Sequence, residues 1–266
     1  MEKLIESFKN KTIELYGKRL EGGKCNFCGS ELGDGEYCEC REAKLRQRFY
    51  KKAAKKLSSY YDFMALGSIE NARNTMKSKF KIPAIFEGYD FDFYETNNSS
   101  QKNALDSVLD YDKNIVRNFL NGTNLILLGN YGTGKTMLMS ILCNKIVEDY
   151  LFDAKFVNGI DLVNKIKSTF HDTSTVSALQ IAELYRNVEF LFIDDIDKLK
   201  PSDYVRELMY SIVNYRIENE LPIIISANHD LDDLDEKYFG EATISRLAAN
   251  GKSKIVRFSH QNWRVA

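Results

Sequence analysis

A glycine-rich run near the middle of the chain has the spacing of a loop that binds phosphate groups. Its eight residues follow the pattern G-x-x-x-x-G-K-T and are Gly129, Asn130, Tyr131, Gly132, Thr133, Gly134, Lys135 and Thr136. In a loop of this type, backbone N–H groups and the amino terminus of the next helix attract an anion. The lysine reaches the β- and γ-phosphates, and the threonine hydroxyl binds Mg²⁺. We therefore expect Lys135 and Thr136 to hold a nucleoside triphosphate and its magnesium ion.

The residues on either side of this loop support that interpretation. The apolar run 124–128 before it is typical of a buried strand, and residues 137–150 after it have helical spacing. Leu138, Leu142 and Ile146 would form one row on that helix. The alternative is a chance match in a glycine-rich loop, which would not require a strand and a helix in these places.

Two adjacent carboxylates follow another apolar run. Phe190–Ile193 has the composition of a buried strand, and Asp194 and Asp195 come directly after it. Hydrolysis of a triphosphate needs a carboxylate that binds Mg²⁺ and a group that polarises the attacking water. We assign the first role to Asp194 and the second, as general base, to Asp195. The alternative is that the two carboxylates only cap a helix.

Two further polar residues are candidates for the same site. Asn228 follows the apolar run 222–226, where its amide would orient a water molecule near the γ-phosphate. An asparagine at a strand end is also common turn chemistry. Arg246 would extend from the surface into the site of a neighbouring subunit, as an arginine finger does. The alternative for Arg246 is a solvated surface side chain.

Four of the five cysteines lie close together near the amino terminus, as two pairs. The ligands that these pairs would offer to a metal are Cys25, Cys28, Cys38 and Cys40. Four thiolates in close pairs suit a tetrahedral Zn²⁺ ion in a structural role. Free thiols or a redox pair are the alternatives. Cys143, in the helix after the glycine-rich loop, is expected to be a small core residue.

Composition and charge point to an ordered cytoplasmic protein with a partner for its amino-terminal part. The 266 residues are 44% hydrophobic and 28% charged, with a net charge of -1. Residues 1–60 carry an excess of basic side chains, and the rest of the chain is acidic. We find no signal-peptide pattern and no apolar run of the ~18 residues that would span a bilayer, so we expect no membrane attachment.

The pattern along the chain predicts two parts. Residues 1–20 and 41–64 have the apolar spacing of amphipathic helices on either side of the cysteines. From residue 101 onward, helical patterns alternate with strands near 124–128, 155–157, 189–193, 222–226 and 254–258. This alternation predicts an α/β fold with a parallel sheet covered by helices on both faces. We expect a small helical zinc-binding domain at 1–66, a junction at 67–100 and a nucleotide-binding domain at 101–266.

The order of these motifs resembles one group of ATPases. From about Pro83 to Trp263, the chain resembles the DnaC/DnaI-type helicase loaders and the related IstB transposition ATPases, which are members of the AAA+ class. The matching segments are Gly129–Thr136, Leu191–Ile196, Ile212–Arg216, Leu221–Asn228 and Gly240–Leu247. The resemblance implies ATP as the nucleotide, Walker A roles for Lys135 and Thr136 and Walker B roles for Asp194 and Asp195. It also implies a sensor role for Asn228 and an arginine-finger role for Arg246.

The amino-terminal part extends the resemblance. Cysteine pairs followed by Arg41 and a basic helix are similar to the zinc-bearing loaders of phages and Gram-positive bacteria. Proteins of the IstB type do not usually have this part. The basic run 41–56 contains Phe49 and Tyr50 and would contact phosphates or an acidic surface of a helicase, unless it is only the solvated face of a helix.

The chain departs from the family pattern at several positions. Asp195 stands where many AAA+ proteins have glutamate, so hydrolysis is expected to be slow. Asp197 stands where relatives often have glycine, and Ala242 where some loaders have a second arginine. The chain is also expected to lack the carboxy-terminal helical lid of larger AAA+ proteins.

The resemblance implies that the chain loads a DnaB-type hexameric helicase onto single-stranded DNA and forms an ATP-dependent homo-oligomer. Lys165, Lys167 and Phe170 lie where similar loaders contact single-stranded DNA, and such contacts would be sequence-tolerant. Phe170 is equally compatible with a core position. Two alternatives stay open: an IstB-like ATPase that regulates a transposase, and a low-turnover ATP-binding protein that titrates a host helicase loader. A kinase would have no task for Asn228 and Arg246.

Overall fold

The computed structural model describes residues 81–150, 152–170, 177–234, 239–248 and 253–259. The chain divides into two units, residues 1–72 and 73–266, and all described residues belong to the second. The helices predicted at 1–20 and 41–64 and the four paired cysteines lie outside the described residues. Among the described helices, none is both long enough and apolar enough to cross a membrane.

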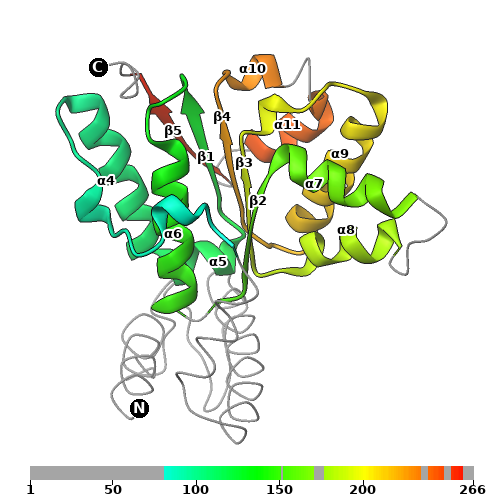
Figure 1. The fold of residues 1–266 in the computed structure, drawn as a ribbon, viewed down its shortest axis with the longest axis horizontal. Helices are drawn as coiled ribbons and strands as arrows, with labels where there is room; N and C mark the ends of the chain where they lie inside the picture. The colour runs from blue at the N-terminus through cyan, green and yellow to red at the C-terminus, as the bar shows by residue number, and fades with distance from the viewer. Residues whose placement is uncertain (1–80, 151, 171–176, 235–238, 249–252, 260–266) are drawn as a thin grey trace, which may run out of the picture. The chain divides into compact units, whose positions relative to one another are not determined.

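The second unit is built on a five-stranded sheet in the order β2-β3-β4-β1-β5, with every neighbouring pair parallel (Figure 1). The strands are β1 (Asn124–Gly129), β2 (Ala154–Asn158), β3 (Phe190–Asp194), β4 (Ile223–Ala227) and β5 (Ser253–Phe258). All five strands lie where the sequence predicts them. β1, β3 and β4 are short, mainly apolar runs, whereas β2 and β5 also contain basic residues.

Helices cover both faces of the sheet. Figure 1 shows α4, α5 and α6 on one face and α7, α8, α9 and α11 on the other. Their bounds are α4 (Ser99–Lys113), α5 (Ile115–Asn121), α6 (Lys135–Glu148), α7 (Gly159–Lys167), α8 (Ala178–Asn187), α9 (Asp203–Glu218), α10 (Leu231–Leu234) and α11 (Glu241–Ala248). Short 3₁₀ turns are η1 (Ala84–Phe86), η2 (Phe91–Phe93), η3 (Ser168–Phe170) and η4 (Ile196–Lys198). The predicted α/β fold with a parallel sheet is confirmed.

The helical pattern that begins at residue 101 forms two helices in the structure, α4 and α5. They meet at Asn114, whose φ of -102° and ψ of 18° are not helical. The Asn114 side chain donates a hydrogen bond of 2.9 Å to the carbonyl oxygen of Asp110. An asparagine that bonds the backbone in this way competes with the regular helical pattern, which explains the break.

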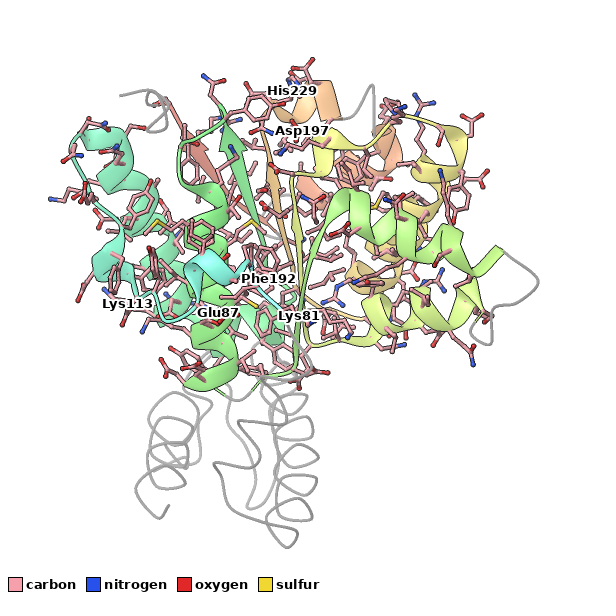
Figure 2. The ribbon with its side chains drawn as sticks, viewed as in Figure 1. Lys81, Glu87, Lys113, Phe192, Asp197 and His229 are labelled. Atoms are coloured by element: carbon pink, nitrogen blue, oxygen red, sulfur yellow. The ribbon has the colours of Figure 1, made fainter. Side chains whose placement is uncertain are left out.

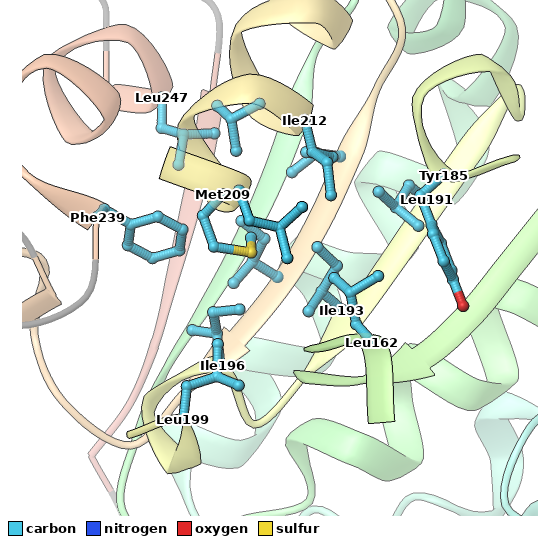
Figure 3. Packing of buried hydrophobic residues seen from close by; sticks show 14 of the residues in the cluster. Leu162, Tyr185, Leu191, Ile193, Ile196, Leu199, Met209, Ile212, Phe239 and Leu247 are labelled. Carbon is cyan, nitrogen blue, oxygen red and sulfur yellow. The ribbon is translucent and has the colours of Figure 1, made fainter. Parts of the chain in front are cut away.

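The central strands of the sheet are held in place by a buried hydrophobic core. All residues of β3 and β4 are buried, as expected for strands covered on both faces. Figure 3 shows Leu191 and Ile193 of β3 packed with Met209 and Ile212 of α9. Because β3, β4 and β1 are parallel neighbours, their carboxyl ends lie together at one end of the sheet. In open parallel sheets, ligands bind at that end.

Arg216, near the end of α9, is fully buried beside the amino-terminal ends of β3 and β4. One terminal nitrogen, Nη1, donates to the carbonyl oxygens of Tyr185, Arg186 and Val188 at 2.9, 3.0 and 2.8 Å. The other, Nη2, donates to those of Glu189 and Pro222 at 3.2 and 2.6 Å. Burial lowers the pKa of Arg216 below its ordinary value. The guanidinium therefore joins the end of α8 to the starts of β3 and β4, a role that sequence reasoning missed.

Candidate nucleotide site

The glycine-rich loop leaves β1 and opens α6, as the sequence predicts. Gly129, Gly132 and Gly134 have φ values of 147°, 70° and 87°, which favour glycine. A Cβ atom on Gly129 would lie 2.3 Å from the carbonyl oxygen of Phe258, and one on Gly134 would lie 2.6 Å from the Tyr94 ring. Side chains are therefore excluded at two of these positions. The loop can turn tightly and present its backbone N–H groups to an anion.

Lys135 lies inside the loop at the start of α6 and is almost fully buried. Its Nζ atom donates to the carbonyl oxygens of Gly129 at 2.6 Å and Asn130 at 2.8 Å, and to Oδ1 of Asn228 at 3.0 Å. Burial lowers the pKa of Lys135, and the neighbouring carboxylates act in the opposite direction. The ammonium is thus placed between the loop and the end of β4, where phosphate oxygens would be alternative acceptors.

Thr136 and Asp194 meet as a magnesium site requires. The Thr136 hydroxyl Oγ1 lies 3.1 and 2.9 Å from the two carboxylate oxygens of Asp194. Ser226 of β4, which the sequence analysis did not single out, donates to Asp194 Oδ1 at 2.5 Å. Burial is the largest influence on Asp194 and raises its pKa. A hydroxyl and a carboxylate beside a phosphate loop fit Mg²⁺, which prefers oxygen ligands and completes its shell with phosphate and water.

Asp195 occupies an unusual backbone conformation directly after β3. Its φ of 52° is in the left-handed region, and its N–H group donates to Ser226 Oγ at 2.9 Å. The carboxylate forms an ion pair of 2.5 Å with Lys198, whose Nζ atom lies 5.8 Å from the ring centre of Tyr131. Strained backbone of this kind is typical of functional sites. The proposed general base is therefore near the phosphate loop but paired with a cation, which the sequence did not predict.

Asn228 reaches the site from the end of β4. Its backbone N–H and its side-chain Nδ2 donate to the two oxygens of Asp197 at 2.9 and 3.0 Å. Figure 2 shows Asp197 and His229 near each other at the carboxyl edge of the sheet. In the sequence, Asp197 is distinguished only as a departure from relatives. The position of Asp197, three residues after Asp194, was the one feature of the sequence that could have indicated its place in the site.

Arg246 is not brought to the phosphate loop of its own chain. It lies on α11 with its side chain 43% exposed. In the part of the chain that the structure describes, its hydrogen bond to Asn214, its ion pair with Glu218 and its contact with the Tyr210 ring are all with α9. A role for Arg246 in catalysis therefore requires a second copy of the chain, and it stays a prediction.

Tyr94 is a contact of the loop that sequence reasoning missed. Its hydroxyl donates to the carbonyl oxygen of Thr133 at 3.2 Å, and its ring fills the space beside Gly134. The ring is buried, and burial raises the pKa of Tyr94. The preceding segment is held to α6 by an ion pair of 3.2 Å between Asp90 and Lys145. Part of the predicted junction at 67–100 therefore packs on the nucleotide-binding loop and its helix.

The other predicted sites are only partly described. Lys165 and Lys167 are exposed on α7, and Lys167 Nζ lies 5.6 Å from the ring centre of Tyr204. Neither the Phe170 side chain nor the zinc cysteines belong to the described residues, so the DNA and zinc sites stay predictions. Within the described ranges, no cluster of three or more His, Cys, Asp or Glu side chains is arranged to hold a metal. Cys143 is buried in α6 as a free thiol.

Known proteins are similar to this chain over most of its length. A family model described as IstB-like ATP binding protein matches residues 67–260. The replicative helicase loader DnaC of Escherichia coli (strain K12) is 27% identical over 201 residues, which cover 73% of this chain and 78% of DnaC. The loader DnaI of Bacillus subtilis (strain 168) is 22% identical over 245 residues, which cover 89% of this chain and 73% of DnaI. The crystal structure of the DnaC helicase loader superposes with a TM-score of 0.58 at 24% identity, covering 66% of this chain and 99% of that one.

Proposed function

The chain belongs to the family of IstB-like ATP-binding proteins, and from this premise we propose that it is an ATP-dependent loader of a replicative DNA helicase. The observation that carries the proposal is the contact between the phosphate loop and the end of β3, through Thr136 and Asp194. Named helicase loaders are among its relatives, and the fold is that of a solved loader. We propose that the chain works in the cytoplasm and releases the helicase on single-stranded DNA without preference for sequence.

The chain's residues would divide the work of hydrolysis. Lys135 and the loop N–H groups would bind the β- and γ-phosphates, and Thr136 and Asp194 would hold Mg²⁺, whose charge would offset that of the phosphates. Asp195 would accept a proton from the attacking water while the oxygen of that water forms a bond to the γ-phosphorus. The bond from that phosphorus to the bridging oxygen then breaks, and ADP leaves with inorganic phosphate. Lys198 contacts Oδ2 of Asp195, so Oδ1 would be the oxygen that accepts the proton.

We propose that ATP also joins neighbouring copies of the chain. Arg246 is half-exposed on α11 and would reach the γ-phosphate bound by an adjacent subunit, which makes each site a product of two chains. The part at 1–66, with zinc on its four paired cysteines, would bind the helicase. Hydrolysis would then separate the neighbouring subunits and free the helicase.

A mixing experiment tests whether Arg246 acts between subunits. Arg246→Ala should lower ATP turnover by about 100-fold or more, because the finger stabilises charge in the transition state. The Lys135→Ala chain should be equally inactive, because alanine cannot bind the β- and γ-phosphates of ATP. In a mixture, the Lys135→Ala chain still supplies an intact Arg246 to the Arg246→Ala chain. We expect turnover to return in the mixture, measured as phosphate release.

The control for that experiment is a mixture of each variant with itself at the same total concentration. Arg246→Lys should restore little of the ATP turnover lost in Arg246→Ala, because lysine lacks the planar fork of donors of arginine. If the two variants stay inactive when mixed, although they still associate with each other, Arg246 does not act in trans.

One observation favours a second candidate, a low-turnover ATP-binding protein that titrates a loader. Asp195 is shorter than the usual glutamate and is paired with Lys198 at 2.5 Å. A protein of this kind would bind ATP and the host's loader but would not deliver a helicase.

A delivery assay separates these functions. The purified chain is incubated with the replicative helicase of its own organism, ATP and circular single-stranded DNA, and helicase on the DNA is measured after gel filtration. We expect helicase on DNA with the wild-type chain and none with Lys135→Ala. A parallel pull-down offers the chain a transposase and the host's loader. Capture of the transposase would support the IstB-like regulator, and capture of the loader without delivery of the helicase would support the titrating protein.

A further inference from the structure

We propose that Asp197 is a positioning residue that fixes the amide of Asn228 with its oxygen facing the phosphate site. The inference rests on the proposed ATP hydrolysis and adds a residue to it. Asp197 is absent from the roles that the motifs assign, and its side chain is completely buried. A buried carboxylate needs a reason to be there, because burial of a charge without partners is costly.

Asp197 meets Asn228 with both of its oxygens. Oδ2 accepts from the Asn228 backbone N–H at 2.9 Å, and Oδ1 accepts from the side-chain Nδ2 at 3.0 Å. His229 Nε2 lies 3.7 Å from the same Oδ2. The carboxylate therefore holds one residue by its main chain and its side chain at once. Rotation of the Asn228 side chain would break one of these two bonds.

The chemistry of the partners decides which way the amide faces. An ionised carboxylate only accepts hydrogen bonds, so the atom of Asn228 beside Asp197 must be the NH₂ nitrogen. The amide oxygen is then directed to the other side, where it accepts from Lys135 Nζ at 3.0 Å. Lys135 is the residue that binds the terminal phosphates in loops of this type.

This arrangement determines what Asn228 offers to the reaction. An amide oxygen at the γ-phosphate accepts a hydrogen bond from the attacking water and so orients it, whereas an NH₂ group would donate to the phosphate. Asp197 thus selects an acceptor at this point. It does so from η4, which directly follows Asp195, so the proposed general base and the residue that positions Asn228 both come from the end of β3.

The test measures ATP affinity and turnover for Asp197→Ala, Asn228→Ala and the double variant. Asp197→Ala should lower kcat by about 10- to 100-fold, the range expected for losing hydrogen bonds to a charged group. The Kd for ATP with Mg²⁺ should change by less than about threefold, because the phosphate contacts remain. The double variant should be no slower than Asn228→Ala alone, since both changes remove the same oriented amide.

Asp197→Asn separates positioning from charge. It removes the charge but keeps one acceptor oxygen at nearly the same place, so its kcat should lie between those of the wild type and Asp197→Ala. The matched control is Asp203→Asn. The Asp203 side chain is a surface carboxylate at the start of α9 with 93% exposure, so this variant should behave as the wild type. Equal losses in Asp197→Asn and Asp197→Ala, or fully multiplicative losses with Asn228→Ala, would overturn the positioning role.

A spectroscopic readout works whether or not the chain hydrolyses ATP. The Asn228 side-chain NH₂ resonances are assigned by their loss in Asn228→Ala. They should be protected from hydrogen exchange in the wild type and lose that protection in Asp197→Ala. Absence of turnover in the wild-type chain would refute the proposed hydrolysis alone. Unchanged protection in Asp197→Ala would refute the role of Asp197.

Discussion

Replacing Arg216 by methionine should lower the free energy of unfolding by roughly 3–5 kcal/mol. Methionine has a similar length but no donors, so five carbonyl oxygens would lose the guanidinium. Those of Tyr185 and Arg186 lie in the last turn of α8, where the helix itself leaves carbonyl groups without partners. Each buried acceptor left unsatisfied costs about 1–3 kcal/mol, partly offset because a buried charge is also removed.

Urea unfolding followed by far-ultraviolet circular dichroism measures this effect. Arg216→Lys should lie between the wild type and Arg216→Met, because an ammonium keeps the charge but reaches fewer of the five oxygens. Arg206→Met is the matched control, since it lies on the same helix with its side chain 43% exposed and should change the free energy of unfolding by less than about 1 kcal/mol. A wild-type midpoint for Arg216→Met would contradict the structural role.

Asp194→Asn should lower ATP turnover by at least about 100-fold, corresponding to the loss of one strong transition-state contact. Without nucleotide, the same variant should be as stable as the wild type or more stable. The reason is that burial raises the pKa of Asp194, which means that the ionised form costs free energy in the folded chain. Thr136 and Ser226 can rotate their hydroxyls to suit an amide.

The pH dependence of this stability difference has a definite sign. The pKa of Asp194 is higher in the folded than in the unfolded chain, so the penalty is fully present above the folded pKa. It shrinks as the pH falls through the folded pKa and vanishes below the unfolded one. Asp194→Asn should therefore gain most over the wild type at neutral pH in thermal unfolding scans, and the two should converge in acid. A variant that is both inactive and much less stable at neutral pH would contradict this account.

The parts of the site that the sequence predicted are those where a motif ties residue type to position. Thr136 and Asp194 are far apart in the chain, but each follows a buried parallel strand, and parallel strands bring their carboxyl ends to one edge. The run of apolar residues before each motif was therefore enough to predict the edge of the sheet at which the site forms. The position of Asn228 beside Lys135 agrees with the same logic.

The parts that could not be predicted depend on contacts between segments that no motif connects. Nothing in the sequence shows that Arg216 would be buried with its charge, because a helical arginine is usually solvated. Tyr94 reaches the phosphate loop from 39 residues away, and the pairing of Asp195 with Lys198 depends on the left-handed backbone at Asp195. These contacts follow from the packed fold and are visible only once it is known.

The proposed role of Arg246 depends on an assembly of chains and cannot be read from one chain. Its contacts with α9 place it on the surface, which is the location that a finger for a neighbouring site needs. The same contacts would also suit an ordinary surface arginine. The mixing experiment distinguishes the two, because only a finger restores turnover to a chain that has lost its own.

Titration of the purified chain with ATP, in the presence and absence of Mg²⁺, tests the central claim most directly. Isothermal calorimetry should show one ATP bound per wild-type chain, tighter binding with Mg²⁺ than without, and affinity at least about tenfold weaker in Lys135→Ala. No binding to the wild-type chain, or equal affinity in the wild type and Lys135→Ala, would contradict the assignment of the nucleotide to this loop.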